Sequence, residues 1–96
     1  MIVVMNRITV AEGLEQDFEE TFVGRDRAVD QMTGFIDLQV LRPVEGRTYI
    51  VMTRWTSREA FDTWTHSATF LSAHKKQQPG FAESRPVLEI YEVFSE

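Results

Sequence analysis

Three side chains in this 96-residue chain have chemical types that could act together on a bound ligand. Asn6 interrupts the apolar run at residues 2–5, and Trp64 and His74 stand ten residues apart near the other end of the chain. An amide donates hydrogen bonds, an indole offers a large rigid surface, and a neutral imidazole binds metal ions. If the three side chains converge in the fold, they form a site.

Each of these residues also has a purely structural explanation. Strand alternation places Asn6 on the same face as Val4 and Ile8, where a buried amide either finds a hydrogen-bond partner or lines a cavity. His74 follows Phe70 by four residues, so it falls on the apolar side of a helix. A single histidine or tryptophan on such a face is more often a packed residue than a ligand. Taken one at a time, the residues leave both explanations open.

The composition is typical of one small domain without thiol chemistry. The absence of cysteine excludes disulfides, thiolate metal sites and a thiolate-ligated heme. A formal net charge of -5, against which the pair Lys75-Lys76 counts little, argues against nucleic acid as a partner. The N-terminal apolar run is too short for a signal sequence or a membrane span. We therefore expect a single domain over residues 1–96, cytoplasmic and without a membrane partner.

The hydrophobic pattern predicts strand, helix, strand, strand, helix and strand in that order. Strands are expected over residues 2–10, 35–41, 47–55 and 87–94, with a hairpin turn around Pro43 to Gly46. Apolar residues from about Leu14 to Met32 recur at helical steps, and this predicts one amphipathic helix that ends at a left-handed Gly34. The order is that of a ferredoxin-like α+β fold, with an antiparallel sheet and helices on one face.

The second helix is expected to begin at Ser57, because the stretch Thr56-Ser57-Arg58-Glu59 has the spacing of a capping box. We expect this helical region to break near Ser67, to resume through His74 to Gln78, and to stop at Pro79.

Both faces of the predicted sheet carry large apolar residues, although helices can cover only one of them. We expect the uncovered face to carry Ile50, Met52, Leu88 and Ile90, or the residues that alternate with them. A homodimer that packs sheet against sheet would bury this face. A partner domain or a higher oligomer would serve the same purpose.

Four segments of the chain resemble a known family. They are Met5-Asn6-Arg7-Ile8-Thr9, Gly34-Phe35, residues 60–64 and Ala73-His74-Lys75. They resemble the small heme-degrading monooxygenases of the IsdG type, within the antibiotic biosynthesis monooxygenase (ABM) superfamily, and the resemblance covers nearly the whole chain. It implies a ferredoxin-like ABM domain that assembles as a dimeric α/β-barrel.

The resemblance also implies a function. In that family an Asn on the first strand, a Trp on a later helix and a His further along form the functional triad, and Asn6, Trp64 and His74 match it. The family's heme is substrate and cofactor at once: the enzyme binds it through a histidine, cleaves the porphyrin with dioxygen and reductant, and releases iron. The resemblance therefore implies heme and an electron-donating reductase as partners, with an external electron donor.

Roles for the three residues follow from a heme in the site. His74 is the expected iron ligand, since the only other histidine, His66, stands at the expected helix break. Asn6 has an NH₂ group that could donate a hydrogen bond to oxygen or peroxide at the iron. In the family the Trp presses on the porphyrin plane and ruffles it, which activates the ring carbons, and this role falls to Trp64.

Further pocket residues are expected from the two helices. Phe22 and Phe70 could wall the macrocycle, although both also suit a core. Arg25 stands where the helical stripe expects an apolar residue, so Arg25, alone or with Lys75 or Lys76, could meet a propionate. The structural explanation for Arg25 is a stem that packs while its guanidinium stays in water.

Two other functions fit the same residues. One is a cofactor-free monooxygenase that oxidises a quinol or polyketide aromatic in an apolar pocket without iron. The other is a carrier that holds heme through His74 without turning it over. A Soret band on addition of hemin separates the first from heme degradation, and a change of that band with reductant and air separates the second.

Overall fold

The computed structural model describes residues 1–25, 27–71 and 80–96. Four strands form one antiparallel sheet in the order β2-β3-β1-β4. They are β1 (Ile2–Thr9), β2 (Phe35–Leu41), β3 (Thr48–Trp55) and β4 (Val87–Glu92). The strand positions and the ferredoxin-like fold predicted from the sequence are confirmed. The sheet is open, with β2 and β4 at its edges, so the described strands of one chain do not close a barrel.

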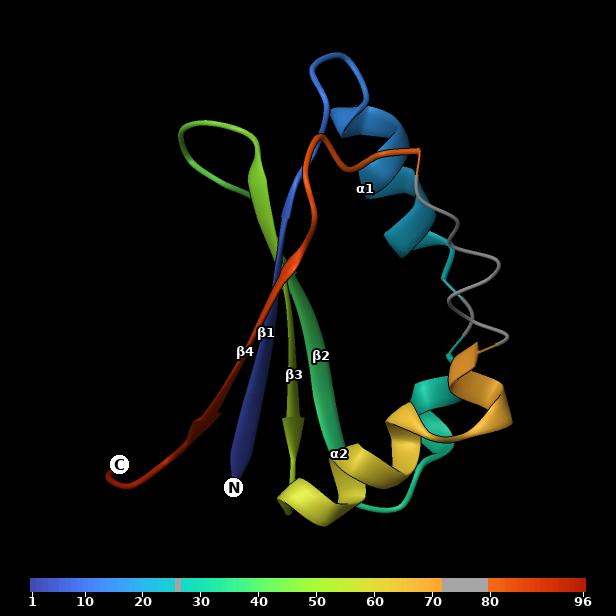
Figure 1. Ribbon diagram of the computed structural model, residues 1–96, viewed down its shortest axis with the longest axis vertical. Helices are drawn as coiled ribbons and strands as arrows, with labels where there is room; N and C mark the ends of the chain where they lie inside the picture. Colours follow the sequence, from blue (N-terminus) through green and yellow to red (C-terminus); the bar gives the residue numbers. More distant parts are fainter. Residues whose placement is uncertain (26, 72–79) are drawn as a thin grey trace.

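The described helices all lie over one face of this sheet (Figure 1). They are α1 (Glu15–Val23), the 3₁₀ helix η1 (Ala28–Gln31) and α2 (Arg58–Thr65). α1 lies toward one end of the strands and α2 toward the end where both termini lie (Figure 1). No helix within residues 1–25, 27–71 and 80–96 is long and apolar enough to cross a membrane.

The single helix expected from Leu14 to Met32 is wrong, because α1 ends at Val23. The Gly24 N–H donates a hydrogen bond of 3.1 Å to the Glu20 carbonyl oxygen, and the Arg25 N–H donates one of 3.3 Å to the Phe22 carbonyl oxygen, so the last turn is closed. Glycine has a low helix propensity. The next apolar residue on the helical stripe, Val29, comes back to the core from η1 instead. Val29 follows Phe22 by seven residues, which equals about two turns of a helix. The spacing of the apolar residues therefore did not reveal the break.

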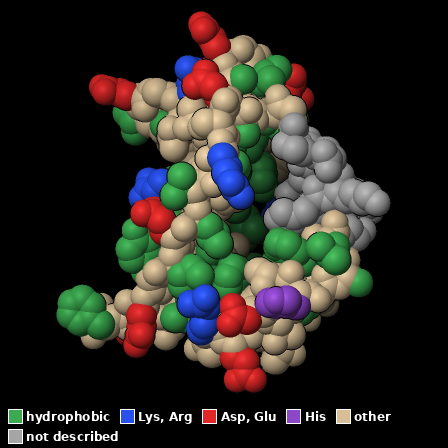
Figure 2. All heavy atoms as spheres, in the orientation of Figure 1, with side chains coloured by type: hydrophobic (Ala, Val, Ile, Leu, Met, Phe, Trp, Pro, Cys, Tyr) green, Lys and Arg blue, Asp and Glu red, His purple; other side chains and the backbone are tan. Residues whose placement is uncertain are grey.

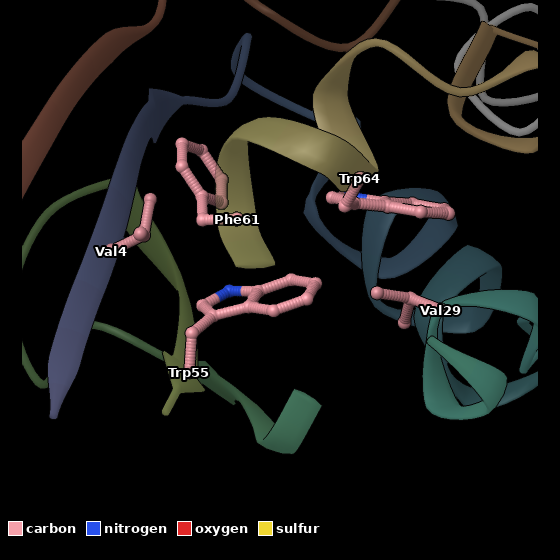
Figure 3. Close-up of a cluster of buried hydrophobic side chains, with 5 residues drawn as sticks. All are labelled: Val4, Val29, Trp55, Phe61 and Trp64. Atoms are coloured by element: carbon pink, nitrogen blue, oxygen red, sulfur yellow. The ribbon is translucent and has the colours of Figure 1, made fainter. Parts of the chain in front are cut away.

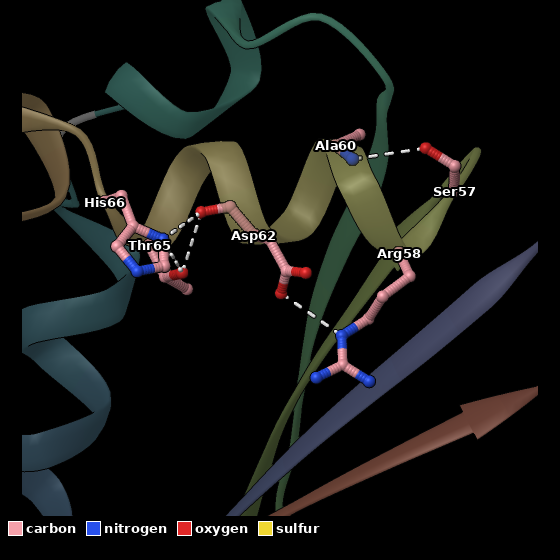
Figure 4. Close-up of polar contacts among 6 residues, drawn as sticks. All are labelled: Ser57, Arg58, Ala60, Asp62, Thr65 and His66. Atoms are coloured by element: carbon pink, nitrogen blue, oxygen red, sulfur yellow. Dashed lines mark hydrogen bonds and ion pairs between the residues drawn. The ribbon is translucent and has the colours of Figure 1, made fainter.

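The predicted start of α2 is confirmed to within one residue, although without the expected capping box, because the residue three positions after the N-cap is Ala60 and not Glu59. Ser57 is its N-cap, and the Ser57 side chain accepts a hydrogen bond of 3.1 Å from the Ala60 N–H (Figure 4). The break near Ser67 is confirmed as well, since α2 ends at Thr65 and residues 68–71 form a new helical turn. Ser67 Oγ accepts a hydrogen bond of 3.0 Å from the N–H of Phe70 and so caps that turn. The expected continuation to Gln78 and the stop at Pro79 lie outside the described residues.

The strand register decides which side chains meet the helices. Val4 lies opposite Thr53 and Asn6 opposite Val51, and all four face the helices. Their neighbours point to the uncovered side, where Met5 lies opposite Met52 and Arg7 opposite Ile50. Ile50 and Met52 therefore lie on the outer face, as expected.

The side chains of β4 face the opposite sides of the sheet from those first expected. Leu88 lies opposite Asn6 and Ile90 opposite Val4, so both face the helices. The alternating residues Val87 and Tyr91 take the outer face instead, and their exposed fractions are 54% and 47%. Either phase of this strand offers an apolar stripe, and only pairing with β1 distinguishes them.

Gly34 joins β2 to the helical layer and is the most constrained glycine of the described chain. Its φ is +87°, and a Cβ built on it would lie 2.5 Å from Ala60 Cβ and 2.8 Å from Thr56 Oγ1. The Gly34 carbonyl oxygen also accepts a hydrogen bond of 2.8 Å from the N–H of Thr56. A glycine here lets the chain pass close to the first turn of α2.

We expect Gly34→Ala to lower the free energy of unfolding by roughly 2–4 kcal/mol, from left-handed strain together with the clash against α2. Chemical denaturation measures the change. Gly46→Ala is the matched control, because Gly46 has a similar φ of +88° but no atom near its Cβ position. Equal losses in both variants would mean that contact with α2 does not matter.

Candidate active site

A cavity of about 460 Å³ lies between the helix-facing side of the sheet and the helices. Its size is within the usual range of small-molecule sites. The lining is mainly apolar, with polar side chains from Asn6, Thr21, Arg25, Thr53 and Thr65. Figure 2 shows apolar side chains in the hollow between the part of the molecule that carries α1 and the part that carries α2.

The cavity brings together five of the six residues predicted for the site. Asn6 comes from β1, Phe22 from α1, Arg25 from the segment after α1, Trp64 from α2 and Phe70 from the turn at 68–71. The sixth residue, His74, lies outside the described residues, as do Lys75 and Lys76.

Asn6 is half-buried on the sheet floor of the cavity. Within the described parts of the chain, no residue forms a hydrogen bond with its side-chain amide. The apolar side chains of Val4, Ile8 and Val51 surround it on the same face of the sheet. An amide in such surroundings has both NH₂ protons and its oxygen available to a ligand.

Trp64 is both a core residue and a cavity wall. Only 8% of it is exposed, and its ring meets that of Phe70 edge to face, with centroids 5.4 Å apart at 90°. Figure 3 shows Trp64 beside Val29 of η1. Phe61, which lies on α2 as Trp64 does, points between Val4 and Trp55. The hydroxyl of Ser67 donates a hydrogen bond of 2.7 Å to the Trp64 carbonyl oxygen and fixes the turn between the two rings.

Arg25 is a buried cation in the cavity wall. Only 9% of its side chain is exposed, so the expected alternative of a guanidinium in water is wrong. Its Nη1 lies 3.1 Å from Asp30 Oδ1, and Asp30 also pairs with Arg27 at 3.4 Å. Because a guanidinium carries five N–H donors, the pair with Asp30 leaves others for an anionic ligand group.

A second cluster of rings closes the cavity at the α1 end. Phe18 packs against Phe22, Tyr49 and Phe81, with centroid distances of 5.0, 4.8 and 6.0 Å. The main chain of residues 80–86 holds Phe81 there, since the Ala11 N–H donates a hydrogen bond of 2.7 Å to the Phe81 carbonyl oxygen. The place of Phe81 could not be predicted from the sequence, because it depends on pairing between distant segments.

Glu19 anchors α1 to the sheet. Its carboxylate accepts hydrogen bonds from Arg42 and from the hydroxyl of Tyr49. These two donors, Arg42 first, lower the pKa of Glu19 to about 2. The hydrogen bond to Glu19 in turn raises the pKa of Tyr49. Because the folded pKa of Glu19 is depressed, the anchor is fully present at neutral pH and is lost only as the pH falls toward 2.

His66 lies on the surface at the C-terminal end of α2 and does not line the cavity. Its Nδ1 donates a hydrogen bond of 2.7 Å to the Asp62 carbonyl oxygen, beside Thr65 (Figure 4). This nitrogen therefore caps the helix.

A ferredoxin-like sheet with its helices over an apolar cavity defines an α+β protein with a ligand-sized cavity between the two layers. The family model described as antibiotic biosynthesis monooxygenase matches residues 1–76. A curated heme oxygenase (mycobilin-producing) from Mycobacterium tuberculosis is 39% identical over 74 residues, which are 76% of this chain and 70% of that protein. The chain therefore belongs to the antibiotic biosynthesis monooxygenase family, and the expected enzyme class, a monooxygenase among the oxidoreductases, is confirmed.

Solved structures agree with this assignment. The heme-degrader MhuD from Mycobacterium tuberculosis, with two hemes bound in its active site, aligns with a TM-score of 0.84 and 33% identity over 100% of this chain and 98% of that one. SnoaB, a cofactor-independent oxygenase from Streptomyces nogalater, aligns with a TM-score of 0.80 but only 21% identity, over 99% of this chain and 94% of that one. The second likeness shows the fold alone.

Proposed function

We propose that this protein is a heme-degrading monooxygenase that cleaves the porphyrin of bound heme with dioxygen and an external reductant and releases the iron. The observation that carries the proposal is one apolar cavity that holds the Trp64 ring, a buried Arg25 and the amide of Asn6, which has no hydrogen-bond partner among the described residues. The similarity to the M. tuberculosis heme oxygenase and to heme-bound MhuD supports it.

The cavity suits heme in three respects. A macrocycle needs broad apolar walls, which Phe22, Trp64 and Phe70 supply. A propionate needs a cation, and the guanidinium of Arg25 in the cavity wall can bind a propionate. The reacting oxygen needs a hydrogen-bond donor, and Asn6 offers one. When bound, heme supplies the iron that activates dioxygen and the ring carbon that is oxidised.

Each residue then has a definite task. Arg25 binds a propionate and sets the orientation of the ring, while Phe22 and Phe70 exclude water from its faces. Trp64 presses against the macrocycle and distorts it. Asn6 orients the reacting oxygen, and His74 is the proposed iron ligand.

Each rival function leaves one residue of the cavity without a role. A cofactor-free oxygenase acting on a neutral quinol has no use for a buried arginine, whereas a ligand with a carboxylate does. A heme carrier needs no free hydrogen-bond donor at the sheet floor, where Asn6 stands. Titration with hemin tests the cofactor-free rival, and aerobic turnover of the hemin complex tests the carrier.

For the two histidines we expect opposite results on titration with hemin. His74→Ala should abolish the Soret shift that marks tight binding, because the chain has no cysteine to replace the imidazole. His66→Ala should leave the shift almost unchanged, since His66 is exposed and its Nδ1 bonds to Asp62. The reverse result would assign the iron to His66. A wild-type protein that gives no Soret shift at all would favour the cofactor-free rival.

We further propose that two copies pack through their outer sheet faces to form the dimeric α/β-barrel, in the cytoplasm, with a separate reductase as electron donor. The outer face carries Met5, Ile50, Met52, Val87 and Tyr91. Its charges are largely paired, as in the contact between Arg7 and Glu89. Paired charges reduce the cost of covering this face.

Sedimentation velocity at micromolar concentration should therefore show a dimer. The variant Ile50→Glu would place an unpaired carboxylate in the centre of that face and should give a monomer. Val44→Glu is the matched control, because Val44 is fully exposed in the turn between β2 and β3. A wild-type monomer, or a dimer that survives Ile50→Glu, would contradict the proposed interface.

A further inference from the structure

The cavity wall contains three threonines, and two of them have used their hydroxyl protons. A hydroxyl has one proton to donate and two lone pairs. Thr21 Oγ1 donates to the Asp17 carbonyl oxygen at 3.0 Å, and Thr65 Oγ1 donates to the Asp62 carbonyl oxygen at 2.9 Å. Each proton is held within its own helix, so neither hydroxyl is free to donate to a ligand.

Thr53 has the opposite hydrogen-bond role. The Nε1–H of Trp55 donates to Thr53 Oγ1 at 3.0 Å. An indole nitrogen only donates, so the direction of this bond is fixed. Trp55 is 0% exposed, so this bond satisfies a polar group that water does not reach. Thr53 donates to none of the residues that the structure describes, and its proton remains available.

The strand register places Thr53 beside Asn6. Thr53 lies opposite Val4, and Asn6 lies opposite Val51, so the two polar residues are diagonal neighbours on the floor of the cavity. Diagonal neighbours of an antiparallel pair have Cα atoms roughly 7–8 Å apart, with their side chains closer. At this spacing there is room for one ligand oxygen to accept a hydrogen bond from each of the two side chains.

We propose that Thr53 is a positioning residue for the proposed reaction: its hydroxyl and the Asn6 amide donate to the same ligand oxygen and fix its direction over the macrocycle. The inference rests on the proposed function and deepens it. Two donors on neighbouring strands restrain the ligand oxygen from two sides, whereas a single donor lets the oxygen turn about one hydrogen bond. Because Trp55 already orients the hydroxyl, little reorganisation is needed when the ligand arrives.

The test uses the full protein loaded with hemin, reduced with dithionite and exposed to carbon monoxide as the probe. Donors near a bound carbon monoxide lower its C–O stretching frequency, so the infrared band reports on them. Thr53→Val should move the band to higher frequency, whereas Thr53→Ser, which keeps the hydroxyl, should restore it. Thr65→Val is the matched control and should leave the band in place, because its proton is bonded to Asp62.

Turnover gives a second measurement. Thr53→Val should slow single-turnover degradation roughly tenfold and change the ratio of tetrapyrrole isomers, while the Soret shift on hemin binding stays near that of the wild type. Thr53→Val leaves the Trp55 N–H without an acceptor, so the protein could unfold for that reason alone. The double variant Trp55→Phe Thr53→Val removes both partners, and Trp55→Phe is then its reference.

The outcomes separate the two proposals. A wild-type protein that binds no hemin would overturn the proposed function and this inference with it. Normal hemin binding with the same infrared band in Thr53→Val and wild type would overturn the inference alone. An equal shift of the band in Thr65→Val would do the same, because it would show that any change in the cavity wall moves the probe.

Discussion

Replacing Asn6 with alanine is expected to leave hemin binding almost intact and to slow degradation by roughly 10²–10³-fold. The amide is half-buried on a largely apolar floor, where its NH₂ group can donate to a ligand. A hydrogen bond to the reacting oxygen matters more in the transition state than in the resting complex. Hemin titration and single-turnover absorbance measure the two effects separately.

Asn6→Leu is the control for volume, because leucine fills nearly the same space without a donor. Equal losses of rate in Asn6→Ala and Asn6→Leu would assign the effect to the lost hydrogen bond. If Asn6→Leu degrades heme at the wild-type rate, Asn6 serves only to fill the floor of the cavity.

The second large effect is expected at Trp64. Trp64→Phe should retain most of the hemin affinity yet slow degradation, since a phenyl ring preserves contact area and relaxes the distortion of the macrocycle. Trp64→Ala should slow it further and should also lower the free energy of unfolding by about 3–5 kcal/mol, because the indole is packed against Phe70 and the core. Thermal melts of the apo-protein and single-turnover spectra measure the two consequences.

Val10→Ala is a useful comparison for Trp64, because Val10 is 0% exposed but does not line the cavity. It should lower stability without changing the degradation rate of the folded protein. A Trp64→Phe variant that also loses only stability would show that Trp64 is a core residue and no more.

Local patterns predicted those parts of the fold that depend on neighbouring residues. The cap at Ser57 and the break near Ser67 follow from short-range hydrogen bonds, and both are confirmed. The end of α1 could not be foreseen, because Gly24 interrupts a stripe whose spacing still fits a helix. The face of Leu88 could not be foreseen either, since it depends on pairing between β4 and β1.

The residues of the candidate site also divide into those that the sequence predicted and those that it did not. Asn6 was found because a polar residue in an apolar strand stands out in the sequence, and Arg25 because it interrupts an apolar stripe. Thr53 and Phe81 went unnoticed: threonine is common in strands, and Phe81 reaches the cavity only through backbone contacts with β1 and Ala11. His74 stays a prediction.

One aerobic turnover of the hemin complex shows whether this protein degrades heme. Wild-type protein with one equivalent of hemin is mixed with reductant in air, while absorbance, released iron and the mass of the tetrapyrrole are followed. We expect the Soret band to disappear, iron to become available to a chelator, and an oxygenated tetrapyrrole to form. A Soret band that persists through reduction and aeration, with hemin recovered unchanged, would rule out heme degradation and leave a heme carrier.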